Sequence, residues 1–259
     1  MSDVLLLEKL EGRVGLLTVN RPDKMNALNN EVRDALFAAL KALRHDDDVR
    51  VIVITGAGDR AFIAGADIGE FKDAGAVEQY RSMQESNIYS LMEDFPKPII
   101  AMINGFCLGG GCELSMACDI RIASDRAKLG QPEVNLGIIP GGGGTQRLPR
   151  LVGEGRAALM IMSGVLIRAD EALDIGLVDS VFPADELREK TLEIARTIGS
   201  KSPVALQAAK ESILAARRMP LDEGLKFERA WFGLLFSTED KEEGVGAFLE
   251  KREPEFTGR

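Results

Sequence analysis

The segment NGFCLGGGCELSMACD spans residues 104–119 and joins three consecutive glycines to a glutamate at the opening of a helix. It follows a short apolar strand expected at residues 98–103. Gly109, Gly110 and Gly111 suit either a tight turn or backbone N–H donors presented to a developing negative charge. Glu113 is favoured in a first helical turn by the helix dipole alone. Close packing and catalysis therefore both remain open as interpretations of this segment.

A second glutamate stands in a comparable setting, Gly130-Gln131-Pro132-Glu133. Proline followed by glutamate is a common helix start, so Glu133 alone indicates little. Two carboxylates in one small pocket cannot both ionise freely, and such a pair supplies a base and an acid together. Addition of water to a conjugated double bond needs both. Because twenty residues separate Glu113 from Glu133, only tertiary folding can bring them together.

The remaining sequence predicts a mixed α/β fold. Residues 4–10 and 13–20 are expected to form a hairpin, and a helix with a 3.6-residue apolar stripe begins at Asn29-Asn30. Short apolar strands are expected at residues 51–55, 98–103 and 119–123. From residue 185 the pattern is helical, with Ser202 as an N-cap before Pro203. We expect a core at residues 1–199 that carries the active site and a helical C-terminal region at 200–259.

The composition is that of a globular chain, because 45% of the 259 residues are apolar and 28% are charged. The formal charge of -9, from 32 Lys and Arg against 41 Asp and Glu, argues against a nucleic-acid surface. The start lacks a basic leader, and no apolar run approaches the roughly 18 residues that span a bilayer. We expect a soluble, untargeted chain with neither nucleic acid nor membrane as a partner.

Cysteine and histidine usage limits the chemistry further. Cys107, Cys112 and Cys118 are odd in number and form no CxxC pair, which favours reduced thiols and a cytoplasmic location. The single histidine, His45, begins the acidic run His45-Asp46-Asp47-Asp48, which is typical of a solvated helix end. We therefore expect no metal site, and neither Ser-His-Asp nor Cys-His catalysis.

Three glycine-rich segments partly match nucleotide-binding motifs, but the residues around them do not fit such a site. Residues 56–61 fit GxGxxA after a strand, but Asp59 would lie near the pyrophosphate and the following residues do not suit a phosphate-binding helix. The glycine runs at 109–111 and 141–144 are not followed by Lys-Ser or Lys-Thr, which argues against a P-loop.

Residues 104–119 resemble the enoyl-CoA hydratase (crotonase) family, and the resemblance covers essentially the whole chain. The other matching segments follow in family order: NRP at 20–22, KMNAL at 24–28, FIAGADI at 62–68, GQPE at 130–133, GIIPGGGGTQRL at 137–148, AAKE at 208–211 and FLEKR at 248–252. The resemblance implies an α/β spiral of β-β-α turns whose helical C-terminal region mediates trimers, commonly paired into hexamers.

The resemblance also implies a site. The backbone N–H groups of Ala66 and Gly110 would hold a thioester oxygen as it gains enolate character. Glu133 would exchange the proton at the α-carbon, while Glu113 would orient and deprotonate the water. The other water- and substrate-binding positions that it implies are Gly141, Ala64, Asp67 and Ile68.

The presence of both glutamates favours the hydratase branch, acting reversibly on short-chain 2-enoyl-CoA of the crotonyl-CoA type. Two alternatives stay open: a double-bond isomerase that uses one carboxylate, and a noncatalytic RNA-associated relative that the acidic balance disfavours. Coenzyme A belongs to the substrate, so the family implies neither a metal nor a redox cofactor. Fatty-acid breakdown, butyrate metabolism and aromatic degradation use similar chemistry.

One departure from the family concerns the CoA phosphates. Many relatives carry lysine two residues after the aspartate of the Ala-Asp segment, where this chain has Gly69. Other cations would then neutralise the phosphates. The CoA-binding positions that the resemblance implies are Lys24, Ala27, Leu28, Phe248 and Lys251, the last two from an adjacent subunit. A solvated or packing role is the alternative for both lysines and for Phe248.

Overall fold

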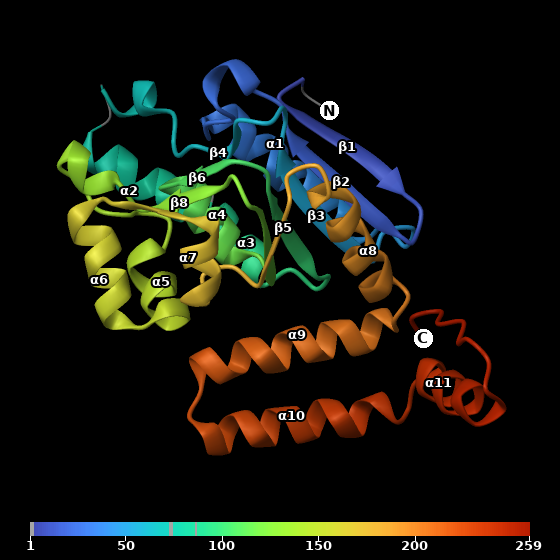
Figure 1. Ribbon diagram of the computed structural model, residues 1–259. Coiled ribbons are helices and arrows are strands. Elements are labelled where there is room, and N and C mark those ends of the chain that lie inside the picture. Colours follow the sequence, from blue (N-terminus) through green and yellow to red (C-terminus); the bar gives the residue numbers. More distant parts are fainter. Residues whose placement is uncertain (1–2, 73–74, 86) are drawn as a thin grey trace.

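Two β-sheets in the N-terminal part of the chain form the core (Figure 1). The structure, a computed structural model, describes residues 3–72, 75–85 and 87–259, so Met1 and Ser2 of the expected leader-free start lie outside the described residues. The strands are β1 (Leu5–Leu10), β2 (Val14–Val19), β3 (Val51–Gly56), β4 (Ala61–Ile63), β5 (Ile99–Ile103), β6 (Phe106–Leu108), β7 (Ile120–Ser124), β8 (Lys128–Gly130), β9 (Leu166–Arg168) and β10 (Ser180–Phe182).

Helices surround the sheets and make up the whole C-terminal part. They are α1 (Asn30–Arg44), α2 (Ala76–Glu85), α3 (Ile88–Glu93), α4 (Gly110–Ala117), α5 (Gly144–Val152), α6 (Glu154–Ser163), α7 (Ala169–Asp174), α8 (Leu187–Gly199), α9 (Pro203–Arg218), α10 (Leu221–Leu235) and α11 (Glu239–Glu250), with 3-10 turns η1 (Pro22–Lys24), η2 (Ile68–Phe71) and η3 (Glu133–Leu136). Among the described residues, no helix is both long enough and apolar enough to cross a membrane.

The larger sheet has six strands in the order β1-β2-β3-β5-β7-β10, and the smaller has four in the order β4-β6-β8-β9. β1 and β2 are antiparallel, with Leu5 opposite Val19, which confirms the predicted hairpin. The other neighbours in the larger sheet are parallel. A mixed α/β fold is therefore confirmed.

The chain advances through the two sheets as a spiral. In each of the pairs β3–β4, β5–β6 and β7–β8, the first strand joins the larger sheet and the second joins the smaller. Helical segments follow each pair, as the β-β-α turns predict. β4, β6 and β8 are parallel neighbours, so their carboxyl ends meet at one edge of the smaller sheet. The segments that follow these three strands are thereby brought together.

Helix α1 was predicted in position and orientation. The side chain of Asn29 caps it by accepting a hydrogen bond from the Val32 backbone N–H at 3.0 Å. The residues of the predicted apolar stripe, Val32, Leu36, Leu40 and Leu43, are buried in the main core. Helical periodicity was sufficient here because one whole face of α1 packs on the core.

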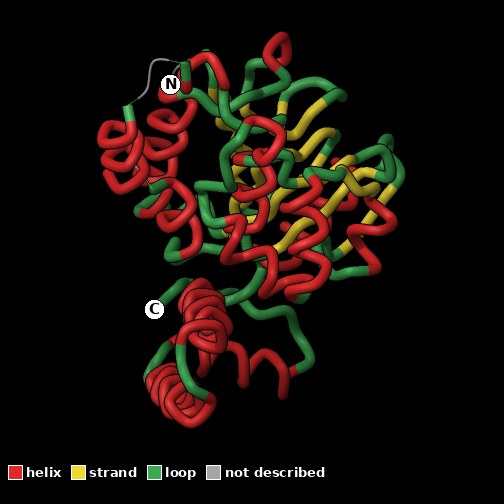
Figure 2. Tube along the Cα trace, turned by 90° about the vertical axis from the view of Figure 1, so that its left-hand side faces the viewer, coloured by secondary structure: helices red, strands yellow, loops and turns green. Residues whose placement is uncertain are grey.

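The C-terminal helices α9 and α10 run antiparallel and form an arm beside the core, and α9 lies closer to the core than α10 (Figures 1 and 2). Ser202 caps α9 and Pro203 is its first residue, as predicted. The buried ammonium of Lys210 fixes α9 to the core by donating to the Asp119 carboxylate at 2.8 Å and to two backbone carbonyls. The turn after α8 falls at residues 200–202, and an independent core at 1–199 stays a prediction.

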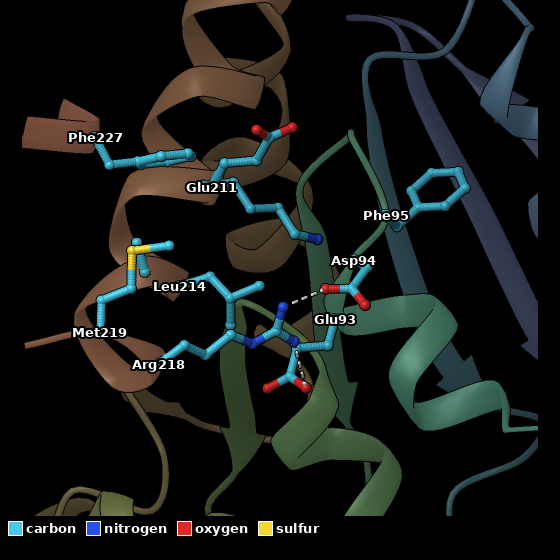
Figure 3. A pocket seen from close by; sticks show the side chains of 10 residues that line it. Glu93, Asp94, Phe95, Glu211, Leu214, Arg218, Met219 and Phe227 are labelled. Atoms are coloured by element: carbon cyan, nitrogen blue, oxygen red, sulfur yellow. Dashed lines mark hydrogen bonds and ion pairs between the residues drawn. The ribbon is translucent and has the colours of Figure 1, made fainter. Parts of the chain in front are cut away.

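A second anchor of the arm lies in a cavity of about 240 Å³ between the α9–α10 hairpin and the end of α3 (Figure 3). The guanidinium of Arg218 pairs there with Asp94 at 2.8 Å and with Glu93 at 3.3 Å. Glu93 is half-buried and also pairs with Arg147 of α5 at 3.0 Å. The arm is thus tied by charge to a helix that begins beside the candidate site.

Candidate active site

A cavity of about 570 Å³ lies where the segments after β4, β6 and β8 meet. Ala64, Gly65 and Ala66 follow β4, Gly109 and Gly110 follow β6, and Pro132 and Glu133 follow β8 shortly after its last residue. Parallel pairing of the three short strands therefore builds the cavity from parts far apart in sequence. The remaining lining residues are Arg33, Ile68, Phe71, Gln79, Tyr89, Glu113, Leu136, Gly137, Ile138, Ile139, Gly141 and Gly142.

Glu113 points into this cavity from the first turn of α4 and is only 3% exposed. The Gly144 backbone N–H donates to Glu113 Oε1 at 2.7 Å, and the Gly142 backbone also hydrogen-bonds to the carboxylate. Burial raises the pKa of Glu113, while these two backbone bonds and the charge of Arg147 oppose the rise. The loop at residues 141–144, called the glycine loop below, thus holds the buried Glu113 carboxylate in a fixed position.

Glu133 enters the same cavity from the start of η3. Its Oε1 atom lies 2.9 Å from the point that a Cβ on Gly109 would occupy, and Gly109 has a φ of +48°, so glycine is required on both counts. With its amide oriented to satisfy both groups, buried Gln131 donates to Glu133 Oε1 at 3.0 Å. Burial, reinforced by the charge of Glu113, raises the pKa of Glu133 to about 7.

Two backbone amides lie beside the carboxylates. The N–H groups of Ala66 and Gly110 donate to no backbone acceptor among the described residues, although Ala66 pairs with Leu28 through its neighbours. The Ala66 nitrogen lies 3.5 Å from the position of a Cβ on Gly110, so the two residues border one space. Gly110 is also the first residue of α4, where the helix dipole favours negative charge.

An apolar wall completes the cavity. Ile68, Leu136, Ile138 and Ile139 line it, although their side chains are largely exposed, and half-buried Phe71 joins them. A group of exposed branched side chains around a concave polar site is typical of a surface that receives an apolar ligand.

Most of the predicted substrate-binding positions line the cavity, but Asp67 does not. Its carboxylate pairs with Arg21 at 3.0 Å and accepts from the Gly69 N–H at the start of η2. The Asp67 side chain is thus held by an ion pair outside the cavity, and its contact with the water or the substrate stays a prediction. The flanking backbone of Ala66 remains in the cavity wall.

The predicted CoA-binding positions lie outside this cavity in the single chain. Lys24 is exposed in η1. The hydrogen bond from Arg21 is the main cause that lowers the pKa of Asp67, and the charge of Lys24 adds to it. Buried Leu28 supports Ala66. Ala27 uses its carbonyl to accept from Arg21. Phe248, 82% exposed, and Lys251 lie at the end of α11, away from the core (Figure 1). Their roles toward CoA stay predictions.

Sequence reasoning gave no role to several groups that shape the site. Gln131 supports Glu133, and Tyr89 of α3 forms part of the cavity wall. Arg147 donates to the Gly142 carbonyl at 2.8 Å and connects the glycine loop through Glu93 to the C-terminal arm. Gln131 and Arg147 lie within matching motifs, which was a usable signal, but nothing in the pattern around Tyr89 marked it.

The site combines two coupled carboxylates with two free amides on a spiral of β-β-α turns. This arrangement is typical of an acid–base enzyme that stabilises a developing oxyanion. A family model described as Enoyl-CoA hydratase/isomerase matches residues 9–259. The chain belongs to the enoyl-CoA hydratase/isomerase family, as the resemblance indicated.

Individual relatives agree over the full length. A short-chain-enoyl-CoA hydratase from Clostridium acetobutylicum is 46% identical over 252 residues, covering 97% of this chain and 96% of that protein. A crotonyl-CoA hydratase from Syntrophomonas wolfei is 44% identical, with 98% of each chain covered. The crystal structure of an enoyl-CoA hydratase from Bacillus anthracis has a TM-score of 0.95 at 41% identity, covering 99% of this chain and 100% of that one. The crotonase-like fold is thereby confirmed.

The coupling of the two carboxylates can be tested by titration. We predict that ¹³C NMR of protein labelled at the glutamate carboxyl carbons shows one carboxyl titrating with a pKa of about 7, which Glu133→Gln removes. Because the negative charge of Glu113 raises this pKa, Glu113→Gln should shift the same titration to lower pH. Titration of Glu133 at the ordinary glutamate pKa, or no shift in Glu113→Gln, would show that the two groups are independent.

Proposed function

We propose that this chain catalyses the reversible addition of water to the double bond of 2-enoyl-CoA thioesters, of the short-chain crotonyl-CoA type, to give 3-hydroxyacyl-CoA. The observation that carries this proposal is the convergence of Glu113 and Glu133 on one cavity bordered by the free N–H groups of Ala66 and Gly110. The two relatives named as short-chain and crotonyl-CoA hydratases support the same reaction.

The amide pair activates the substrate. The thioester oxygen accepts hydrogen bonds from the Ala66 and Gly110 N–H groups, which withdraws electron density from the conjugated double bond and exposes C3 to attack. As the new bond forms at C3, negative charge builds on this oxygen as an enolate. The positive end of α4 lies at Gly110, so the charge is stabilised by a helix N-terminus in addition to the two amides.

The carboxylate pair moves the protons. Ionised Glu113 accepts a proton from water, whose oxygen bonds to C3, while protonated Glu133 gives its proton to C2 as the enolate collapses. One proton enters the pair and one leaves it, so no net charge is left behind. The pair must hold a single proton before the reaction, and the raised pKa of Glu133 keeps that proton in place near neutral pH.

The substrate supplies everything else that the reaction needs. Coenzyme A arrives as part of the thioester, and no separate cofactor takes part in the proposed steps. Ile68 and Phe71 with the apolar side chains of η3 and the following loop offer a surface for a short acyl chain. Lys24, Ala27 and Leu28 are proposed to lie along the CoA, since Lys24 is exposed and Leu28 supports the oxyanion amide.

The arm is proposed to assemble the chain into a homotrimer or homohexamer, in which Phe248 and Lys251 reach the ligand of an adjacent subunit. Helix α10 buries none of its residues within one chain. Phe232 and Phe236 pack edge to face on each other, 64% and 55% exposed, with Leu221 and Leu234 also exposed. Such a surface is typical of a subunit interface. The three free, buried thiols fit a cytoplasmic location.

Glutamate substitutions test the proposed reaction directly. We expect Glu113→Gln and Glu133→Gln each to lower kcat for crotonyl-CoA hydration by roughly 10³-fold, because each removes a proton acceptor or donor without changing side-chain size. The loss of ultraviolet absorbance of the conjugated thioester measures the rate. KM should change little, since the oxyanion amides remain.

The matched control is Glu154→Gln, which changes an exposed carboxylate of α6 and should leave hydration unaltered. Near-normal hydration by either active-site variant would refute the roles given to the pair. Wild-type protein that leaves crotonyl-CoA untouched but converts 3-enoyl-CoA to the 2-enoyl isomer would instead favour the isomerase alternative.

Disruption of the exposed aromatic pair tests the assembly. We expect Phe232→Asp with Phe236→Asp to dissociate the oligomer in sedimentation velocity, because charges at an apolar interface are desolvated without partners. Leu6→Asp, a similar change on the exposed side of β1, is the control and should leave the oligomer intact. A wild-type chain that sediments as a monomer would contradict the proposed assembly.

A further inference from the structure

Tyr89 is a buried side chain of the cavity wall that the proposed steps do not use. It lies in α3, is 8% exposed overall, and packs in the main core with Ile88 and Met92. The residue also lines the cavity that contains both glutamates. A tyrosine so placed packs its ring in the core and brings a polar hydroxyl to the cavity wall.

The end of the tyrosine ring borders both Gly110, whose amide is assigned to the thioester oxygen, and Gly142 of the loop that binds Glu113. A Cβ placed on Gly110 would lie 3.2 Å from the Tyr89 hydroxyl oxygen. A Cβ placed on Gly142 would lie 2.5 Å from Cε2 and Cζ of Tyr89 and 2.7 Å from Oε2 of Glu113. Because Gly110 and Gly142 have no side chains, there is room for the tyrosine ring beside them. The edge of this ring and the Glu113 carboxylate both lie next to the α-carbon of Gly142.

The hydroxyl has no protein partner in the part of the chain that the structure describes, and it is not sealed off from the cavity. Burial, together with the charge of Glu113, raises the pKa of Tyr89 well above its usual value, so the group stays protonated. A protonated phenol is a hydrogen-bond donor. This donor therefore faces the cavity that the reactants enter.

We propose that the Tyr89 hydroxyl is a further catalytic contact that donates a hydrogen bond to the oxygen adding to C3: the water in the forward direction and the 3-hydroxyl in reverse. This inference rests on the proposed hydration. The contact would orient one lone pair of the water away from C3 while Glu113 accepts its proton, leaving the other lone pair for the new carbon–oxygen bond.

The alternative acceptor is the thioester oxygen, which already has two donors in Ala66 and Gly110. A Cβ on Gly142 would meet both the Tyr89 carbon that carries the hydroxyl, at 2.5 Å, and Glu113 Oε2, at 2.7 Å, whereas the Glu133 carboxylate lies beside Gly109. Glu113 is the glutamate assigned to the water, whereas Glu133 serves C2. The position of the hydroxyl therefore favours the water over the enolate oxygen.

The rates of two reactions in the variant Tyr89→Phe show whether the hydroxyl donates to the water or to the thioester oxygen. Tyr89→Phe keeps the ring in its packed position and removes only the hydroxyl. We expect kcat for crotonyl-CoA hydration to fall by roughly tenfold, the effect of one lost hydrogen bond. Exchange of the C2 hydrogens of butyryl-CoA with D₂O, followed by NMR, should keep its wild-type rate, because this exchange needs Glu133 and the oxyanion amides but adds no water to C3.

Every other outcome overturns the inference. Equal losses in hydration and exchange would place the hydroxyl on the thioester oxygen or on Glu133, and unchanged hydration would leave Tyr89 as a packing residue. Retention of exchange also reports that the variant is folded. Tyr80→Phe is the matched control, since Tyr80 is the other tyrosine and is 66% exposed. Wild-type protein inactive on crotonyl-CoA would instead refute the proposed hydration itself.

Discussion

Desolvation of two neighbouring carboxylates is the constraint on which this site depends. Glu113 is almost completely buried, yet it stays in place because backbone N–H groups of the glycine loop donate to it. Burial, and with it the charge of Glu113, raises the pKa of Glu133, which allows the pair to retain one proton near neutrality. Gly109 admits the Glu133 carboxylate, and Arg147 holds the loop carbonyl of Gly142. The same glycines thus allow close backbone packing and position the carboxylates that transfer protons.

The topology explains why residues from distant segments meet. The functional segments follow the carboxyl ends of three adjacent parallel strands, β4, β6 and β8, so the pairing of these strands fixes the distances between them. The glycine loop that binds Glu113 leads into α5, whose Arg147 reaches Glu93 and through it Arg218 of the arm. A series of ion pairs therefore connects the arm to the glycine loop, and Figure 3 shows those of Arg218 with Asp94 and Glu93.

Much of this arrangement could be predicted from sequence, for reasons that differ by element. The hairpin and α1 carry long, regular apolar patterns, and Ser202-Pro203 marks the start of α9 by its capping chemistry. The three-residue strands β4, β6 and β8 are too short to show any period, yet they position the site. Glu113 and Glu133 were predicted from motif chemistry. Tyr89 was not, because its proposed role depends on α3 packing against two glycines. The ion pair that holds Asp67 was not predicted either, because its partner Arg21 is distant in sequence.

The proposed reaction requires a thioester oxygen that binds the Ala66 and Gly110 amides while the acyl carbons lie between the two glutamates. A crystal structure of the protein with butyryl-CoA, which has no double bond to hydrate, tests this most directly. We expect the thioester oxygen within about 3 Å of both amide nitrogens, with C2 facing Glu133 and C3 facing Glu113. A thioester oxygen that contacts neither amide, or an acyl chain outside the space between the glutamates, would contradict it.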